Sequence, residues 1–241
     1  MARSARPHDL PDGDASVDAL PDALRQAISQ HWTQRVVSEL QVSRTFARLG
    51  PWLRSLRADA TVVDMVERAA HEEVQHAELC LHLAAVYAGE RPPAPEVPFE
   101  MPVFGFEDER LEAAVHVVGL CCVNETIATA YLERCLALAT TPLARAANRA
   151  HLREEIDHAR LGWAHLASSS LTPDLRKQLA VCLPRILAAN VPLWEQPDAH
   201  LPVDGVPAHG LPSHADSAET IRHAVRELVL PGFRHVGIVA G

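Results

Sequence analysis

Apolar residues recur at helical spacing along most of the chain. This periodicity predicts a helix over residues 21–49 that is ended by Gly50 and Pro51, and a second helix that starts after Asp59 and ends at Gly89. The two helices are expected to pair as a first helical hairpin. No segment of useful length has the alternating pattern of a strand, so the sequence predicts an all-α fold.

The segment between the second and third helices is rich in proline. Residues 89–108 begin GERPPAPEVP and cannot be helical throughout, whereas a further helix is expected from about Asp108 to Ala139. A proline-rich connector of this length can span roughly 60 Å, and a helix of about 30 residues is roughly 45 Å long. The connector can therefore return along the bundle and let the third helix lie parallel to the second.

The second half of the chain contains two strong helix-start signals. Thr141 followed by Pro142, and Thr172 followed by Pro173, each place an N-cap residue before a proline at the first helical position. The chain is then irregular through QPDAHLPVDGVPAHGLPSH, and a last short helix is predicted over residues 217–230. These signals extend the all-α prediction to the end of the chain.

The boundaries of the folded part follow from the same pattern. Residues 1–20 have no apolar periodicity and are predicted to be a flexible tail. Residues 21–241 are predicted to form a single domain, with a helical core over residues 22–168 and a C-terminal helical extension over residues 172–241. The chain has 241 residues, 48% of them hydrophobic, which is enough for a substantial core.

Composition narrows the classes of partner. The formal net charge is −9 and no cluster of Lys and Arg is evident, which argues against a nucleic-acid surface and favours a small-molecule partner. Neither a signal peptide nor a membrane span is expected. The five cysteines form an odd set without a C-x-x-C pair, which is typical of reduced thiols, so a cytoplasmic location is predicted.

Histidine and glutamate residues are concentrated in two stretches of helical pattern. In HLREEIDHAR, the helical repeat places His151, Glu155 and His158 on one stripe. An upstream stretch, HEEVQHAE, contains Glu73 and His76 at the same E-x-x-H spacing. Glutamate and histidine three positions apart share a helical face, so two such helices facing each other supply half of a dinuclear metal site.

A single glutamate in each of the other two core helices completes the pattern. Glu39 and Glu125 lie among apolar neighbours, where an unpaired carboxylate is costly and a metal ion is a strong partner. Each precedes an E-x-x-H motif by about one helix–turn–helix length, as in two related hairpins. The predicted metal ligands are Glu39, Glu73, His76, Glu125, His151, Glu155 and His158.

Further acidic residues flank the predicted ligands. Glu72 and Glu154 each precede a ligand glutamate and are candidates to hold the outer nitrogens of ligand imidazoles, which fixes their orientation. Asp157 is a candidate for the same role. An exposed charged helix face is the alternative for all three residues.

The order Glu, E-x-x-H, Glu, E-x-x-H resembles the ferritin-like di-iron carboxylate proteins over roughly residues 22–168. The resemblance implies a four-helix bundle with a long crossover between its second and third helices. It also implies two iron ions (Fe2+/Fe3+) per chain, O2 as co-substrate and an external electron donor, which can be a protein. A homodimer is suggested by this resemblance alone.

His151 distinguishes among the branches of that family. It makes the last core helix read H-x-x-x-E-x-x-H, which is similar to the p-aminobenzoate N-oxygenase family of di-iron enzymes, although this chain is shorter than typical members. That similarity implies oxygenation of a small organic substrate, in particular N-oxygenation of an amine. The alternative is a histidine one turn away from the site that pairs with Glu154 or faces solvent.

Other classes remain open from the sequence alone. One is a ferroxidase or another ferritin-like metal-handling protein, and another is a di-iron hydroxylase or desaturase. Cys80 and Thr129 occupy positions similar to those of active-site residues in bacterial multicomponent monooxygenases, but a role in core packing explains each equally well. A non-enzymatic bundle with a charged seam is the third alternative.

Overall fold

The computed structural model describes residues 10–239, and their regular secondary structure is helical apart from one isolated antiparallel bridge between Val206 and Leu211. The all-α prediction is confirmed for this part of the chain. The elements are α1 (Ala15–Asp18), α2 (Asp22–Ser55), α3 (Ala60–Ala88), α4 (Glu109–Val117), the π-helix η1 (Val118–Glu125), α5 (Thr126–Leu138), α6 (Pro142–Ala167), α7 (Pro173–Trp194), the 3-10 helix η2 (Pro207–His209), α8 (His214–Ala224), the π-helix η3 (Val225–Val229) and α9 (Leu230–His235).

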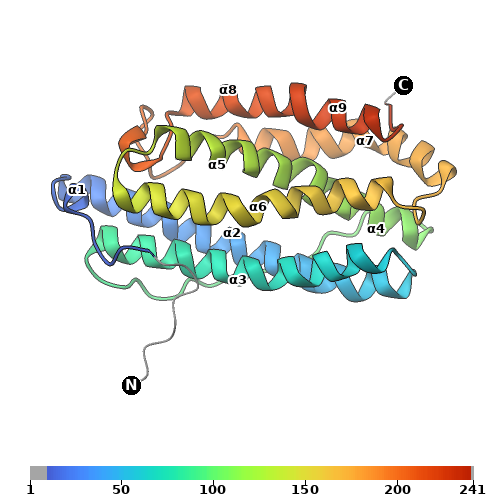
Figure 1. Ribbon diagram of the computed structural model, residues 1–241, viewed down its shortest axis with the longest axis horizontal. Helices are drawn as coiled ribbons and strands as arrows, with labels where there is room; N and C mark the ends of the chain where they lie inside the picture. Colours follow the sequence, from blue (N-terminus) through green and yellow to red (C-terminus); the bar gives the residue numbers. More distant parts are fainter. Residues whose placement is uncertain (1–9, 240–241) are drawn as a thin grey trace, which may run out of the picture.

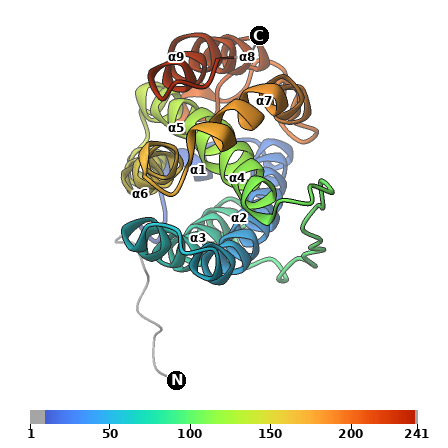
Figure 2. The same ribbon diagram turned by 90° about the vertical axis from the view of Figure 1, so that its right-hand side faces the viewer.

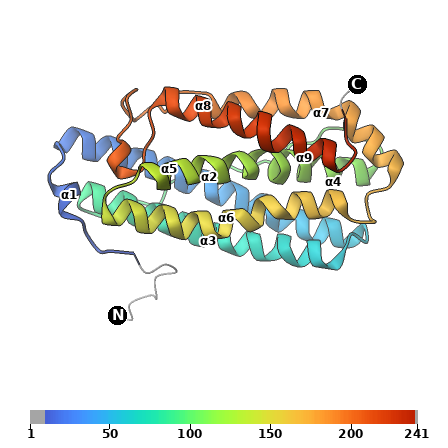
Figure 3. The same cartoon turned by 45° about the horizontal axis from the view of Figure 1, so that its top comes forward.

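The long helices lie along one axis in three layers (Figure 1). Helices α2 and α3 form one layer, α6 and the continuous rod α4–η1–α5 form the next, and α7 with α8–α9 covers the side of the rod away from α2 and α3 (Figure 2). A view from above the outer layer shows α8 and α9 running as one rod beside α7 (Figure 3). The middle of the molecule is therefore enclosed by helices on several sides.

The proline-rich connector has no helix between Gly89 and Asp108. It contacts the outside of α2, where Gln41 Nε2 donates to the carbonyl of Pro98 at 2.8 Å. It then reaches the start of α4, where the Glu112 carboxylate accepts the backbone N–H of Phe104. Helix α3 and the α4–η1–α5 rod run in the same direction, so the connector returns along the length of the bundle (Figure 1).

Local signals explain where several helices begin and end. Asp59 caps α3 by accepting the backbone N–H of Thr61, and Gly89 ends that helix in the left-handed region at φ 81°. The hydroxyl of Thr172 accepts the backbone N–H of Leu175 at the start of α7. These boundaries agree with the sequence predictions, because caps are local interactions that depend on few residues.

The predicted stop at Gly50 and Pro51 is wrong, because α2 continues to Ser55. Proline removes one helical hydrogen bond, but Leu49 and Leu53 on either side are almost fully buried in the core. Burial of two leucine side chains contributes roughly 3–6 kcal/mol, which offsets a cost of about 3 kcal/mol for an internal proline. Tertiary packing therefore overrides the local stop signal.

The predicted last helix over residues 217–230 is also too short. It begins at His214 and continues through the π-helix η3 into α9, which ends at His235. Phe233 on α9 is 1% exposed and stacks edge-on against Trp163 of α6, with ring centroids 5.1 Å apart. Packing against α6 explains why the helix extends beyond the segment with clear periodicity.

Part of the predicted flexible tail 1–20 is folded onto the bundle. Val17 on α1 is 1% exposed, and the Asp14 carboxylate accepts the backbone N–H of Leu143 at 3.0 Å, which caps α6 from outside its own sequence. The flexible-tail prediction is therefore wrong from residue 10 onward, since one apolar side chain and one carboxylate provide contacts without any periodic pattern. Residues 1–9, which share that prediction, lie outside the described residues.

Within residues 10–239, one helix is long and apolar enough to cross a membrane. The rod Glu109–Leu138 has a mean hydropathy of 1.4 in its most apolar window, and 72% of that window is buried inside the protein. The core helix of a soluble protein can be equally long and apolar, and the burial of this rod between two other layers agrees with that role.

A buried histidine without a partner predicts how stability depends on pH. His165 on α6 is 4% exposed, its Nδ1 atom has no hydrogen-bond partner, and burial lowers its pKa to about 4. Acidification from pH 7 to pH 5 protonates this histidine in the unfolded chain but not in the folded one. His165 should therefore lower the free energy of unfolding by roughly 2 kcal/mol when the pH falls from 7 to 5.

The substitution His165→Leu should remove this pH-dependent loss, which urea unfolding at pH 7 and pH 5 can measure. His223→Leu is the matched control, because His223 is exposed on α8 and should change the pH dependence little. If the wild type and His165→Leu lost the same amount of stability between pH 7 and pH 5, the prediction would be contradicted.

Candidate metal centre

Three helices and the π-segment η1 bring the seven predicted ligands together inside the bundle. Helix α2 contributes one of them, α3 two, the end of η1 one and α6 three. Each side chain belongs to a residue that is 5% exposed or less: Glu39, Glu73, His76, Glu125, His151, Glu155 and His158. The cluster is therefore shielded from water, and the charges within it must balance one another.

One part of the cluster joins the two E-x-x-H motifs. Ligand atoms of Glu73, His76, Glu155 and His158 all lie within 4.8 Å of one another. The Nδ1 atom of His158 is 2.9 Å from Glu73 Oε1 and 3.2 Å from Glu155 Oε2. The Nδ1 atom of His76 is 3.3 Å from Glu73 Oε2. These four residues could hold one metal ion.

A second, overlapping group contains His151. Ligand atoms of Glu39, His76, His151 and Glu155 also lie within 4.8 Å of one another. His151 Nε2 is 3.0 Å from Glu155 Oε1, and the rings of His151 and His76 have centroids 4.2 Å apart. The prediction that His151 shares the inner face with Glu155 is confirmed, and a solvent-facing histidine is excluded. His76 and Glu155 belong to both groups, which places two candidate metal positions side by side.

Glu125 lies at the edge of these two groups rather than within either one. Burial raises the pKa of Glu125 well above its usual value, and the nearby carboxylates of Glu155 and Glu73 raise it further. These causes favour the protonated form of the Glu125 carboxyl group, which is hydrogen-bonded to Glu155. A cation would remove the cause of this protonation, because it offsets the repulsion among the carboxylates.

The outer nitrogens of two histidines bind carboxylates of the opposite helix. His76 Nε2 on α3 donates to Glu154 Oε2 on α6 at 3.1 Å, and His158 Nε2 on α6 donates to Glu72 Oε2 on α3 at 3.0 Å. This confirms the contacts expected for Glu72 and Glu154. Their crosswise arrangement directs the Nδ1 atom of each ring toward the centre, as an oriented metal ligand requires.

Asp157 does not have the role considered for it. Its carboxylate accepts from Arg160 at 3.1 Å and lies 3.7 Å from Arg68. It is a half-exposed surface acid, because its position on α6 turns it away from the inner stripe. The alternative of a charged outer helix face is therefore correct for this residue.

The charge balance of the cluster fits bound cations. Burial alone would lower the pKa of His76, but its bonds to Glu154 and Glu73 raise the pKa well above its ordinary value. Similar bonds raise the pKa of His158, and the histidines in turn hold the pKa of Glu155 well below its usual range despite burial. Protons on the rings of His76 and His158 would thus offset part of the negative charge of the carboxylates. Metal ions could replace these protons, so metal binding should release protons.

Sequence reasoning missed a partly buried arginine at the cluster. Arg35 Nη2 donates to Glu39 Oε1 at 2.7 Å, and the Arg35 side chain is only 19% exposed. The spacing in TQRVVSEL was a usable signal, because residues four apart share a helical face. Glu39 therefore already has one cationic partner before any metal ion binds.

The two residues compared with multicomponent monooxygenases have different surroundings. Thr129 donates its hydroxyl to the backbone carbonyl of Glu125 at 2.8 Å, which is a helix-packing contact. Cys80 is fully buried, and burial raises the pKa of its thiol well above the ordinary value, with Glu39 adding to the effect. A protonated thiol in the core and a hydroxyl bound to its own helix agree with the packing interpretation of both residues.

The π-segment η1 was also absent from the sequence predictions. It ends at Glu125 and lies against α6 where Gly162 would bring an added Cβ atom within 2.7 Å of Cys121 and Cys122. Glycine is needed there for the close approach of the two helices. Gly162 is therefore a local signal in the sequence for this contact.

No family model, curated protein or solved structure matches this chain. The chemistry of the cluster therefore rests on its geometry. Carboxylate oxygens together with imidazole nitrogens suit iron or manganese, whereas the described residues provide no thiolate set of the kind that structural zinc sites use.

Proposed function

We propose that this chain is a ferritin-like di-iron oxygenase that uses O2 to oxygenate a small organic substrate, specifically the nitrogen of an amine. The observation that carries the proposal is a buried cluster of Glu and His side chains. The E-x-x-H motifs of α3 and α6 face each other in this cluster, and one glutamate from α2 and another at the end of η1 lie beside them. In this proposal, α2–α3 and α4–α6 are the two hairpins of a ferritin-like bundle, and the connector is its long crossover.

Each residue of the cluster is assigned to an iron position in this proposal. Glu73, His76, Glu155 and His158 would hold one iron ion, and Glu39 and His151 would hold the second together with Glu155, whose carboxylate has two oxygens. His76 would serve only one of the two positions, because its outer nitrogen is bonded to Glu154. Glu125 would lose its proton and join them. Bound iron would supply the redox chemistry that reduces O2, and a partner protein would supply the external electrons.

The protein around the cluster contributes orientation and exclusion of water. Glu72 and Glu154 hold the imidazole rings from outside, which leaves the inner nitrogens aimed at the centre. Burial keeps bulk water from competing for the site. His151 supports the N-oxygenase branch, since it lies inside the cluster rather than on the helix surface. A cytoplasmic location and a homodimer are proposed from the cysteine usage and from the resemblance, respectively.

A single-turnover experiment tests the function. Protein reconstituted anaerobically with Fe2+ should hold two iron ions per chain. Mixing it with 18O2 and a panel of arylamines should yield an N-oxygenated product that carries the label, detected by mass spectrometry. Consumption of O2 without a labelled product would support a ferroxidase instead. A chain that binds no iron would support the charged-seam alternative.

The variant His151→Ala separates iron binding from amine oxidation. Six of the seven candidate ligands remain, so most of the iron should be retained, whereas product formation should fall at least tenfold because one neutral donor is lost from the second position. His71→Ala on the exposed face of α3 is the matched control. Unchanged turnover in a folded, fully loaded His151→Ala protein would remove the reason for choosing the N-oxygenase branch.

A further inference from the structure

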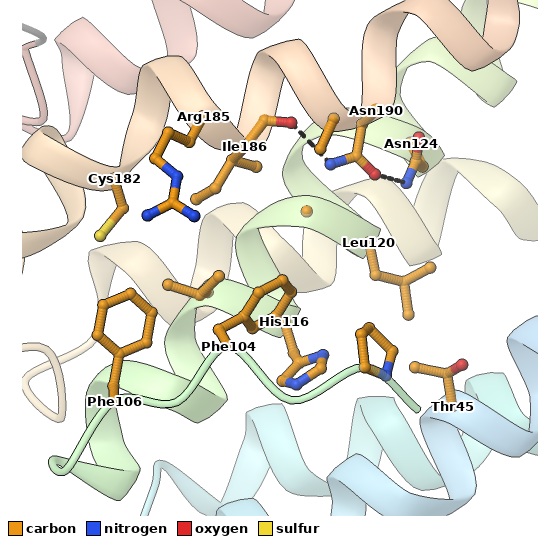
Figure 4. Close-up of a pocket in the computed structure, with 14 residues that line it drawn as sticks. Thr45, Phe104, Phe106, His116, Leu120, Asn124, Cys182, Arg185, Ile186 and Asn190 are labelled. Carbon is orange, nitrogen blue, oxygen red and sulfur yellow. Dashed lines mark hydrogen bonds between the residues drawn. The ribbon is translucent and has the colours of Figure 1, made fainter. Parts of the chain in front are cut away.

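A separate cavity lies on the far side of η1 from the metal-binding cluster. It has a volume of about 330 Å³ and is lined by α4, η1, α7, Thr45 of α2 and the end of the connector (Figure 4). Its walls are mainly apolar and include Phe104, Phe106, Val115, Leu120 and Ile186. None of the seven candidate metal ligands lines it. A volume of this size falls in the range of small-molecule sites.

The cavity contains one cationic side chain without an acidic partner. The guanidinium of Arg185 on α7 points into the cavity, toward the side that carries Phe106 and Cys182 (Figure 4). No Asp or Glu lines the cavity, and no ion pair or hydrogen bond of Arg185 occurs among the described residues 10–239. Two other arginines of the outer rods do form ion pairs, Arg222 with Glu219 and Arg226 with Glu227.

The side-chain amides in the cavity already have hydrogen-bond partners within the protein. Asn124 Nδ2 donates to Asn190 Oδ1 at 2.7 Å, and Asn190 Nδ2 donates to the carbonyl of Ile186 at 2.7 Å (Figure 4). Asn124 Oδ1 in turn accepts from Trp194 Nε1 at 2.9 Å. His116 is buried, and that burial lowers its pKa, so the ring is neutral at pH 7. The cavity therefore carries the positive charge of Arg185 alone.

We propose that this cavity binds a small organic acid, with its apolar body between the connector phenylalanines and α7 and its carboxylate on the guanidinium of Arg185. Arg185 is exposed, but its guanidinium lies beside apolar walls, and a charged hydrogen bond there favours a carboxylate over a neutral group of the same size. The apolar walls exclude a ligand that is polar throughout. The site is distinct from the metal centre, so binding does not require iron.

Titration with three eight-carbon probes tests this assignment. Trp194, which is bonded to Asn124 at the wall, should report occupancy through its fluorescence, and calorimetry gives the stoichiometry. Octanoate should bind saturably with one molecule per chain, and about tenfold or more tighter than 1-octanol. Octylammonium should bind weakest. Absence of saturable octanoate binding, or octylammonium binding equal to it, would overturn the proposal.

Two variants and one control locate the ligand. Arg185→Gln should weaken octanoate about tenfold or more and leave 1-octanol unchanged. Lys177→Gln, on the same helix but paired with Asp174, should bind octanoate like the wild type. Ala189→Phe places a ring in the cavity from the exposed side of α7 and should weaken both probes. Equal binding of octanoate by the wild type and by folded Arg185→Gln would contradict the assignment.

A comparison of chelator-treated and iron-loaded protein separates this site from the proposed function. Octanoate affinity should agree within about twofold in the two forms, because no cluster residue touches the cavity. Retained octanoate binding in a protein without iron would leave this inference standing even if the di-iron proposal failed. Binding that appears only with iron would show that the probe occupies the metal centre instead.

Discussion

Replacing Glu155 with glutamine should empty the candidate metal centre while leaving the chain folded. Glu155 belongs to both groups of potential ligands, and its carboxylate contacts His151 at 3.0 Å and His158 at 3.2 Å. The amide of glutamine retains the size of the side chain but loses the negative charge that metal ions require. The iron content measured after reconstitution should fall from about two ions per chain to near zero.

A matched control and a second variant show whether a loss of iron results from the lost ligand or from a folding defect. Glu133→Gln removes the same charge from the exposed face of α5 and should retain both iron ions. Glu155→Ala should lose iron as well, but it also leaves buried imidazoles without a partner, which costs about 1–3 kcal/mol of stability for each. Wild-type iron content in a folded Glu155→Gln protein would exclude a dinuclear site at this cluster.

Shortening the connector should prevent native folding altogether. Helix α3 ends at Ala88 and α4 begins at Glu109, and these two positions lie toward opposite ends of the bundle (Figure 1). A helix with the 29 residues of α3 is roughly 43 Å long, whereas five extended residues span at most about 18 Å. Replacing residues 90–108 by five residues should therefore abolish the cooperative thermal transition.

A second replacement of the same segment isolates the effect of length. A Gly/Ser-rich connector of unchanged length keeps the reach and removes only contacts such as that from Gln41 to Pro98. It should fold with a modest loss of stability, of the size expected for a few hydrogen bonds at about 1 kcal/mol each. A cooperative transition in the five-residue variant would show that α3 and α4 can connect at the same end, as in a simple antiparallel bundle.

The parts of the fold that could be predicted from the sequence depend on local chemistry. The start of α3 at Asp59 and its end at Gly89 are determined by a carboxylate cap and a left-handed glycine, which act over a few residues. The continuation of α2 through Pro51 depends on leucine burial against another helix, which no local pattern records. The cap that Asp14 provides for α6 joins residues far apart in the sequence, and only the tertiary structure reveals it.

The candidate site was predictable to a similar extent and for a related reason. The E-x-x-H spacing places Glu73 with His76 on one face, and the helical repeat brings His151 to the stripe of Glu155. The crosswise bonds between α3 and α6 depend on the relative rotation of the two helices, so the sequence could suggest Glu72 and Glu154 but not which ring each would bind. The ion pair of Arg35 with Glu39 adds a charge that the ligand pattern alone does not contain.

The π-segment η1 also bears on how such a chain could diversify. A π-helical stretch arises when one extra residue is accommodated within an α-helix, and a single position corresponds to about 100° of rotation. Loss of one residue between Val118 and Glu125 would thus turn either the residues of η1 that line the cavity or Glu125 itself away from their present direction. In evolutionary terms, one codon inserted or deleted here can change the relation between the cavity and the metal-binding cluster without altering the rest of the bundle.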